Sequence, residues 1–440
     1  MLSRLAVRPA AVLSAAVVPA ALLAAAVGLT ATAAPAHAAT VISPPTITAP
    51  LGGLGPYPTG TPVTFTFSET GAGTAVSYEY ALNGGSTQTV AAPSGVAGVP
   101  VTPERQRSVL TVYAVAADGT ASAGTVDIFT AFAATPAADH DLNGDGLPDL
   151  LTVGGTRGLA AGLWLATGKS GRKGATGSPA VSLPATDIGI NGNGFSVPGS
   201  PADFTGAQAI TGHFSADGFQ DVLLYYPSGN DAGGGAVLAG SGDGSALQPD
   251  SGSECTIPSG GLTDFNGDNP LQVVNAYGSI YGTGLPDLLA TSGDPGNGYY
   301  LDYYDAGSPC LYFNTFTVHT PTPDGTADWN QWTLATLGYA GGTGMFLWNE
   351  STGALYLWAG LTAADNGDGT GTLTYTQYRI AAHWHTGKPL ATLEAADING
   401  DGVPDLWTVT PAGAAQAYLV SHLSASGTAQ IRAGKRQQLP

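Results

Sequence analysis

The sequence predicts an all-β protein with two regions, and three observations support that class. Short apolar runs recur along the 440 residues and are separated by turns rich in glycine, asparagine and aspartate. Hydrophobic residues make up 43% of the chain and charged residues only 10%, which is enough apolar material for a packed core. Related segments also recur about 60 to 70 residues apart, and such a period indicates a repeat architecture.

The first 38 residues have the pattern of a secretory signal peptide. Arg4 and Arg8 precede a run of alanine, valine and leucine that ends in Ala36-His37-Ala38. We therefore expect cleavage between Ala38 and Ala39, followed by secretion. No second apolar stretch of about 20 residues follows, so we expect no membrane span after cleavage.

The charge balance excludes some partners. The chain carries 32 acidic and 13 basic residues, a net charge of −19 at pH 7. Removing the two arginines of the predicted signal peptide makes this charge more negative. Nucleic acid and anionic membrane surfaces would repel such a protein. We expect a monomer in an extracellular setting.

Residues 44–133 predict a β-sandwich. Val63, Phe65 and Phe67 alternate with polar residues, which places them on one face of a strand, and similar alternation recurs up to the boundary expected at 133–138. Several such strands in about 90 residues favour an immunoglobulin or fibronectin-III type of sandwich. The Cys–Trp–Cys pattern of true immunoglobulin domains is missing from this stretch, so the fibronectin-III type is preferred.

One motif occurs twice in the second region. Residues 141–153 read DLNGDGLPDLLTV, and residues 397–409 read DINGDGVPDLWTV. Aspartate and asparagine oxygens on one tight turn are the donors that Ca2+ prefers, together with backbone carbonyls. The predicted ligands, in which Leu147 and Val403 act through their carbonyls, are Asp141, Asn143, Asp145, Leu147 and Asp149 in the first loop and Asp397, Asn399, Asp401, Val403 and Asp405 in the second.

Two other interpretations of these loops are an EF-hand and a turn without metal. An EF-hand requires a glutamate at loop position 12, where this chain has Thr152 and Thr408, and it requires flanking helices. That interpretation is rejected. A plain turn without metal is the remaining alternative, because aspartate, asparagine and glycine are common in turns.

The motif and the strand-like run after it resemble the FG-GAP repeat, also called the VCBS-type repeat. Weaker copies begin at His213, Ser279 and Tyr339, and they lack some or all of the acids. The resemblance implies an integrin-α-like β-propeller over residues 136–440. Five copies imply about five blades, although seven is the commoner number in that family and stays open.

The two cysteines are Cys255 and Cys310. In an exported protein an isolated pair predicts one disulfide. It would connect the end of the second repeat to the outer strands of the third.

Three functions fit this sequence. We favour a secreted Ca2+-binding adhesion protein or a carbohydrate- or protein-binding module, with calcium in a structural role and an extracellular glycan or protein as ligand. Eight aromatic residues are candidates for stacking on sugars: Tyr299, Tyr300, Tyr303, Tyr304, Trp329, Trp332, Trp358 and Trp384.

The alternative is an extracellular carbohydrate-active hydrolase or lyase built on the propeller. It requires suitably placed acids, for which the candidates are Asp302, Asp305, Asp328, Glu350 and Glu394. No catalytic constellation stands out in the sequence. His383 and His385 would share one face of a strand, but no third metal ligand is evident. A purely architectural wall or surface-layer protein is the third option.

Overall fold

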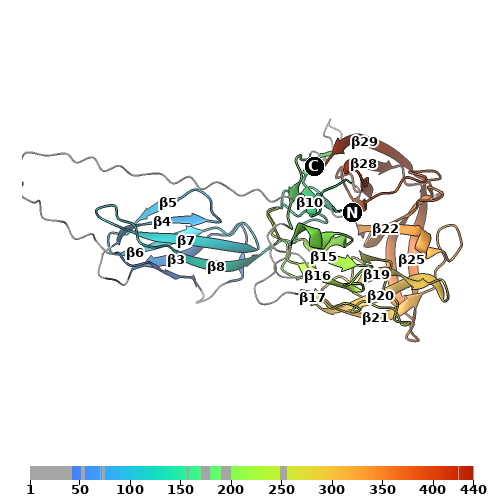
Figure 1. Cartoon of the computed structure of the whole chain (residues 1–440), viewed down its shortest axis with the longest axis horizontal. Coiled ribbons are helices and arrows are strands. Elements are labelled where there is room, and N and C mark those ends of the chain that lie inside the picture. The colour runs from blue at the N-terminus through green and yellow to red at the C-terminus, as the bar shows by residue number, and fades with distance from the viewer. Residues whose placement is uncertain are drawn as a thin grey trace, which may run out of the picture.

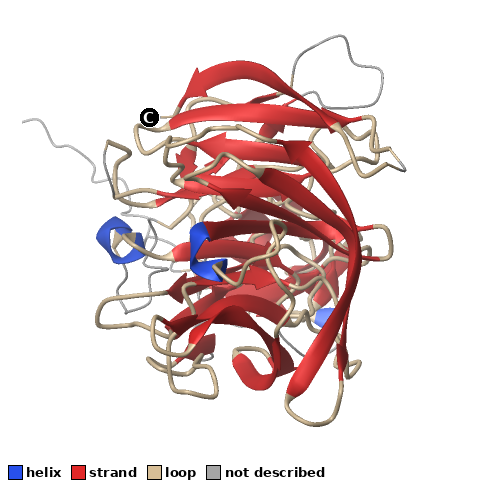
Figure 2. Cartoon of the chain, turned by 90° about the vertical axis from the view of Figure 1, so that its right-hand side faces the viewer, coloured by secondary structure: helices blue, strands red, loops and turns tan. Residues whose placement is uncertain are grey.

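The predicted all-β class is confirmed. In a computed structural model of the chain, the described residues form strands, turns and short 3-10 helices, with no α-helix among them (Figure 2). None of the helices in this described part is long and apolar enough to cross a membrane. The predicted signal peptide, residues 1–38, lies outside the described residues. These are 42–50, 55–69, 71, 75–155, 158–169, 179–189, 200–247, 255–424 and 426–439.

The N-terminal region contains two sheets that enclose one core (Figure 1). Phe65 and Phe67 from one sheet pack with Tyr78, Leu110 and Phe129 from the other, and all five side chains are fully buried. The first sheet has the order β1 (Thr46–Thr48), β3 (Val63–Ser68), β6 (Val96–Val101). The second has the order β2 (Tyr57–Pro58), β8 (Thr125–Phe132), β7 (Arg107–Ala116), β4 (Ala75–Leu82), β5 (Gln88–Ala91). Strand alternation creates this core, because every second residue points inward.

The C-terminal region consists of successive antiparallel sheets. The first comprises β9 (Leu150–Val153), β10 (Leu163–Ala166) and β13 (Thr186–Asp187), with β11 (Gly168–Lys169) and β12 (Ala180–Val181) forming a separate pair. The second comprises β14 (Gln208–Gly212), β15 (Asp221–Tyr226), β16 (Gly234–Leu238) and β17 (Cys255–Ile257). β9 pairs with β10, and β14, β15 and β16 pair in succession, so most neighbours in these sheets are also neighbours along the chain.

An eight-stranded sheet follows, and it combines two further four-stranded units. One unit is β18 (Gln272–Asn275), β19 (Leu288–Asp294), β20 (Gly298–Ser308) and β21 (Leu311–Val318). The other is β22 (Trp332–Tyr339), β23 (Gly342–Asn349), β24 (Leu355–Asp365) and β25 (Thr370–Ala381). A short parallel pairing between β21 and β25 joins the two units. The last sheet is β26 (Thr392–Ala396), β27 (Asp405–Val409), β28 (Ala414–Ser421) and β29 (Gln430–Gln438). The 3-10 helices η2 (Pro201–Phe204) and η3 (Trp329–Gln331) lie in connections.

The first strands of these units form a closed ring. We call β9, β14, β18, β22 and β26 the ring strands, because each contacts the next and β26 returns to contact β9. Glutamine side chains bridge neighbouring ring strands: Gln208 binds the backbone of Val273, and Gln272 binds that of Leu334. At the closure, the Glu394 carboxylate accepts the Leu151 N–H at 3.0 Å. Side chains therefore hold together strands that do not pair through their backbones.

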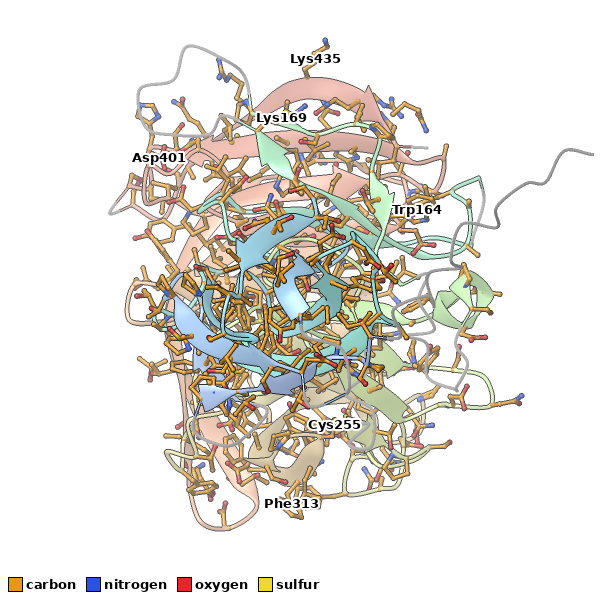
Figure 3. All side chains as sticks on the ribbon, turned by 90° about the vertical axis from the view of Figure 1, so that its left-hand side faces the viewer. Trp164, Lys169, Cys255, Phe313, Asp401 and Lys435 are labelled. Carbon is orange, nitrogen blue, oxygen red and sulfur yellow. A yellow bond between two sulfur atoms is a disulfide. The ribbon has the colours of Figure 1, made fainter. Side chains whose placement is uncertain are left out.

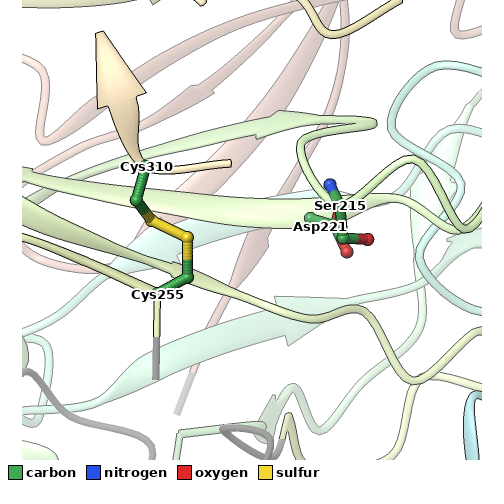
Figure 4. The surroundings of a disulfide bond; sticks show 4 residues. All are labelled: Ser215, Asp221, Cys255 and Cys310. Carbon is green, nitrogen blue, oxygen red and sulfur yellow. A yellow bond between two sulfur atoms is a disulfide. The ribbon is translucent and has the colours of Figure 1, made fainter. Parts of the chain in front are cut away.

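The predicted disulfide between Cys255 and Cys310 is confirmed (Figure 4). Cys255 begins β17, and Cys310 lies in the turn between β20 and β21. The bond therefore links the second unit to the third, as the sequence predicted. In the chain-entropy account a loop of this size stabilises the fold by about 4 kcal/mol.

The N-terminal region contacts the ring region beside the second unit. Arg105 Nε lies 3.5 Å from Asp243 Oδ2, and the Gln106 N–H donates to the Ser241 carbonyl at 2.9 Å. The Ala133 N–H donates to the Asp217 carbonyl at 2.9 Å. Figure 3 views the molecule with the N-terminal strands in front of the ring region and with Asp401, Cys255 and Phe313 labelled around them.

Candidate metal-binding loops

The loop at 141–149 is organised by its first aspartate. Asp141 Oδ1 accepts the N–H groups of Gly144 at 2.7 Å and Asp145 at 3.2 Å, and its Oδ2 accepts the Gly146 N–H at 2.8 Å. Asn143 Oδ1 accepts the Asp145 N–H at 2.9 Å, and Asp145 Oδ1 accepts the Leu147 N–H at 2.9 Å. The carboxylates are thus turned into the loop, toward its backbone.

The loop at 397–405 repeats this pattern. Asp397 accepts the N–H groups of Asp401 at 3.1 Å and Gly402 at 2.9 Å. Asn399 Oδ1 accepts the Asp401 N–H at 2.8 Å, and Asp401 Oδ1 accepts the Val403 N–H at 2.9 Å. The structure therefore brings each predicted group of oxygen donors together within its own loop, and the two loops are built alike.

Backbone geometry is shared by the full loops and by two of the weaker copies. We number each loop from its first residue, which is 141, 213, 279 or 397. In this numbering, positions 4 and 6 of every loop have positive φ values, which glycine adopts without steric cost. These residues are Gly144 (76°), Gly146 (81°), Ala216 (60°), Gly218 (85°), Gly282 (73°), Gly284 (82°), Gly400 (66°) and Gly402 (83°). Only one of the eight, Ala216, has a side chain, so the loops at 213 and 279 keep the conformation without the full set of acids.

The aspartate at position 9 connects each loop to the third strand segment of its unit. One oxygen of Asp149 accepts the Gly168 N–H at 2.8 Å, and one of Asp405 accepts the Val420 N–H at 2.7 Å. The weaker copies do the same: Asp221 accepts from Gly240 at 2.9 Å, and Asp287 accepts from Ala306 at 3.0 Å. All four aspartates have no exposed surface.

The second oxygen of the position 9 aspartate usually faces the loop itself. Asp149 Oδ2 accepts the N–H groups of Leu142 and Asn143 at 3.0 and 3.1 Å. Asp221 Oδ2 accepts from Ser215 at 2.7 Å, as Figure 4 illustrates. This acid is therefore a structural clamp in every one of these loops, whether or not the other acids are present.

Burial dominates the electrostatics of these clamps. Burial, with a smaller contribution from neighbouring carboxylates, raises the pKa of Asp149 to about 7 and the pKa of Asp405 to about 8. Burial also raises the pKa of Asp141 and the pKa of Asp397. Bringing several acids together in a partly buried loop thus disfavours their charged forms, and a bound cation would remove that penalty.

The donor chemistry of both loops fits Ca2+. Within the described residues the ion pairs are Arg105 with Asp243 and His140 with Glu394, so no basic side chain neutralises either loop. Asp405 Oδ2 is buried, and the backbone N–H of Asn399 beside this carboxylate lowers the Asp405 pKa in part. Hydrogen bonds from N–H groups leave further lone pairs on the other oxygens.

The acidic side chains of these loops do not by themselves surround one metal position. No group of three His, Cys, Asp or Glu side chains in the described part of the chain is placed to hold one metal ion. Amide and backbone oxygens, which that set does not include, therefore matter for these loops. Asn143 and Leu147 would supply such oxygens in the first loop, and Asn399 and Val403 in the second.

Most of the aromatic residues considered for sugar stacking are buried, which corrects that expectation. Tyr299 is half-buried, while the other seven have between 0% and 8% of their surface exposed. Trp358, for example, stacks on Tyr375 with ring centroids 3.8 Å apart inside the core. These residues lie between sheets because large apolar side chains are needed there to fill the space.

The acids proposed for catalysis are dispersed. Asp302 is fully buried and accepts a hydrogen bond from Thr317 at 2.8 Å, whereas Asp328 lies beside Trp332. Only Glu350 and Glu394 line the same cavity, at the centre of the ring. Sequence reasoning missed the partner of Glu394, which is His140, although His140 immediately precedes the first motif.

No protein-family profile matches this chain, and no curated protein matches it. Among solved structures, Kluyveromyces lactis Hsv2 with a complete loop 6CD aligns with 86% of this chain and 96% of its own length. The identity is 8% and the TM-score 0.25. A likeness at that level carries no argument about fold or function.

Proposed function

We propose that this chain is a secreted, calcium-stabilised binding protein of the FG-GAP type. An N-terminal module of fibronectin-III or immunoglobulin type would carry a five-bladed β-propeller. Calcium bound at residues 141–149 and 397–405 would stabilise the propeller, and the folded protein would bind an extracellular glycan or protein.

The shared construction of the two full loops carries this proposal. Asp141 and Asp397 organise their loops through the same backbone groups, although 256 positions separate them in the chain. The copies at 213 and 279 reach the same backbone conformation without the aspartate of position 1 and the asparagine of position 3. Those two side chains are therefore not needed for the turn, and cation binding gives them a reason to be present.

The ring of sheets supports the propeller part of the proposal. Five successive units each contribute one ring strand, and the last unit closes on the first. Such closure leaves few free sheet edges. The two sheets with a common core at the N-terminus support a sandwich module.

Thermal melting of the mature protein with Ca2+ and with EGTA tests the calcium role. A ligand that binds only the folded state stabilises it by about 2.7 kcal/mol per site at a concentration 100 times its Kd. We expect Ca2+ to raise the Tm by several degrees. The double variant Asp145→Ala and Asp401→Ala should lose this response, because each change removes one exposed oxygen donor per loop.

A matched control variant removes the same number of aspartates as the test variant. Asp365→Ala and Asp368→Ala change two acids in an exposed turn, so this control should retain the full calcium response. A wild-type melt that is identical in Ca2+ and EGTA would reject the calcium role and leave the loops as turns.

A further inference from the structure

The ring strands surround a polar cavity of about 400 Å³. Its lining includes Gln208, Gln272, Trp332, Thr392 and Glu394, which come from successive units of the ring. A volume in this range is typical of small-molecule sites in proteins. The acidic loops 141–149 and 397–405 do not line this cavity, because they adjoin one end of the ring strands β9 and β26.

The cavity is open at one end and closed at the other. Residues near the starts of the ring strands, such as Leu271, Asn330 and Ala391, are exposed. Residues near the strand ends are buried: Thr211 is 5% exposed and Asn275 is 2% exposed. The open end is therefore the mouth, and the end near the acidic loops is the floor.

His140 closes the floor by bonding to three other units. Its Nδ1 lies 2.8 Å from Thr211 Oγ1 and 2.8 Å from Glu394 Oε1, and its Nε2 lies 3.2 Å from Tyr277 Oη. His140 is 5% exposed, and both it and Tyr277 have positive φ values, 64° and 48°. Residues held in this sparsely populated conformation are concentrated at functional sites.

The floor places a carboxylate beside the cavity. Glu394 Oε1 is buried and lies 2.8 Å from His140 Nδ1, while Oε2 accepts the Leu151 N–H at 3.0 Å. A carboxylate oxygen that accepts one hydrogen bond keeps a further lone pair. Glu394 is 9% exposed and lines the cavity, so Oε2 is the atom that can accept a hydroxyl of a ligand.

We propose that this cavity binds a neutral sugar, as a free monosaccharide or as the end of a glycan chain. Glu394 would accept a ligand hydroxyl at the floor, and Tyr277 and the ring threonines would offer further hydroxyl contacts. The inference rests on the proposed function, since it places the glycan site of that binding protein.

Charge and lining select this class of ligand. His140 and Glu394 form a pair with no net charge when both are ionised, so the floor favours neither a cation nor an anion strongly. The protein as a whole has a net charge of −19, and Glu350 at the mouth adds to the repulsion of anions. Hydroxyl and amide side chains line the cavity, among them Thr211, Asn275 and Thr336, and they match a neutral ligand that carries several hydroxyl groups.

Among the described residues, the N-terminal region contacts the end of the ring opposite the mouth. Its contacts are with Ser241, Asp243 and Asp217, which follow β16 and β14 at the ends where the acidic loops lie. A glycan could therefore enter without displacing that region.

Tryptophan fluorescence of the mature protein in Ca2+ tests the site directly. The probes are D-glucose, D-galactose, D-mannose, L-fucose and N-acetyl-D-glucosamine, each titrated separately. Two variants accompany the wild type: Ala391→Trp, which fills the mouth, and Glu394→Gln, which keeps the shape of the floor. Ala364→Trp adds the same side chain on an exposed, distant strand position and serves as the control.

At least one sugar should bind to the wild type and to Ala364→Trp with the same Kd. Its Kd should rise at least about tenfold in Ala391→Trp and in Glu394→Gln, provided that both melt near the wild-type Tm. Unchanged sugar binding in Ala391→Trp would overturn the cavity assignment, as would the failure of all five sugars to bind.

A glycan array probed with the same proteins separates this inference from the proposed function. Array binding that persists in Ala391→Trp would place the glycan site elsewhere, so the cavity proposal would fail while the binding function stands. Array binding lost only in Ala391→Trp and Glu394→Gln supports both. The absence of array binding by the wild type, in Ca2+, would reject the cavity proposal and the glycan ligand of the proposed function, and would leave a protein as its remaining ligand.

Discussion

Two kinds of loop adjoin the ring strands at the same end of the ring, and comparing them separates what folds a loop from what could bind metal. The loops at 141 and 397 have the full set of Asp and Asn side chains, whereas the loop at 213 has lost two of the four and the loop at 279 has lost three. All four nevertheless share left-handed residues at positions 4 and 6. All four also use the position 9 aspartate to hold a later strand segment of the same unit.

The unit that begins at β22 shows the opposite extreme. Here the loop is reduced to a two-residue turn, Ala340-Gly341, with φ values of 55° and 79°. Two positive φ values in succession match the tight hairpin turn that twists with its strands. This turn has neither the position 9 acid nor the other donors. The longer loop and its buried acid are therefore kept or lost together.

The residues of the motif have two different roles. The left-handed residues at positions 4 and 6 and the position 9 aspartate build the loop, because they occur in all four long loops. The oxygens of positions 1, 3 and 5 come as a complete set only in the two full loops, and we attribute them to cation binding.

Removing the clamp should have the largest effect and should not depend on the loop type. Asp149→Ala and Asp221→Ala each leave buried N–H groups without an acceptor, which costs about 2–3 kcal/mol of the free energy of unfolding. The cost for Asp221→Ala should be the same in Ca2+ and EGTA, since its loop lacks the other donors. Urea unfolding followed by circular dichroism measures both.

The exposed change Asp368→Ala is the control and should alter stability by less than about 0.5 kcal/mol. If Asp221→Ala were as mild as this control, the clamp would have no structural role. If it were damaging only in Ca2+, the distinction between full and weak loops would fail.

Much of this arrangement could be predicted from the sequence. The strands after the full loops begin at Leu150 and Asp405, where apolar runs follow the motif. The disulfide also followed from the cysteine count and the exported character of the chain. These features depend on local patterns, which a single sequence displays directly.

The role of the position 9 acid could not be predicted, because its partner lies 15 to 19 residues away in a strand whose register the sequence does not display. The same contact is made by Asp221 and Asp287 in loops that have few other acids, so it does not depend on the full motif. His383 and His385 were expected on a strand. They lie instead in bends after β25 ends at Ala381, and His385 has a φ of 50°.

A full loop can be built from a weak one, which gives the next largest effect. The loop at 213 already has Asp217, Gly218 and Asp221 in place. His213→Asp with Ser215→Asn completes the donor set on a backbone that is already correctly folded. We expect one additional Ca2+ per molecule by isothermal titration calorimetry, and about 2.7 kcal/mol of added stabilisation at 100 times its Kd.

The paired control is His213→Asn with Ser215→Ala, which also removes the contacts of His213 with Phe219 and Ala137. It should bind no more Ca2+ than the wild type. An unchanged stoichiometry in the completed loop would mean that the full loops need some feature beyond the motif.

Stability should depend on pH differently in the two kinds of loop. Burial raises the pKa of Asp221 to about 7, whereas an unfolded aspartate titrates near 4. Between these values the folded state binds the extra proton, so the free energy of unfolding falls as pH rises, by up to about 1.4 kcal/mol per pH unit for this group. In EGTA, Asp149 should contribute to the pH dependence of the free energy of unfolding in the same way. Bound Ca2+ would keep Asp149 ionised and so remove its contribution to that dependence.

Urea unfolding at several pH values between 4 and 8 measures this slope. Asp221→Asn should flatten it equally in Ca2+ and EGTA, and Asp149→Asn should flatten it only in EGTA. Equal flattening by Asp149→Asn in both conditions would show that calcium does not reach the first loop's clamp.

The smallest expected effect concerns the one position where a weak loop departs from the glycine pattern. Ala216 has a φ of 60° at position 4, where the other three long loops have glycine. Its Cβ makes this conformation unfavourable by roughly 1 kcal/mol, so Ala216→Gly should stabilise the protein by up to that amount, less the greater chain entropy of an unfolded glycine. The reverse change, Gly400→Ala, should destabilise the full loop by a similar amount. If Ala216→Gly destabilised the protein, the left-handed backbone of the weak loop would depend on contacts of the alanine side chain, and the four loops would not share one folding rule.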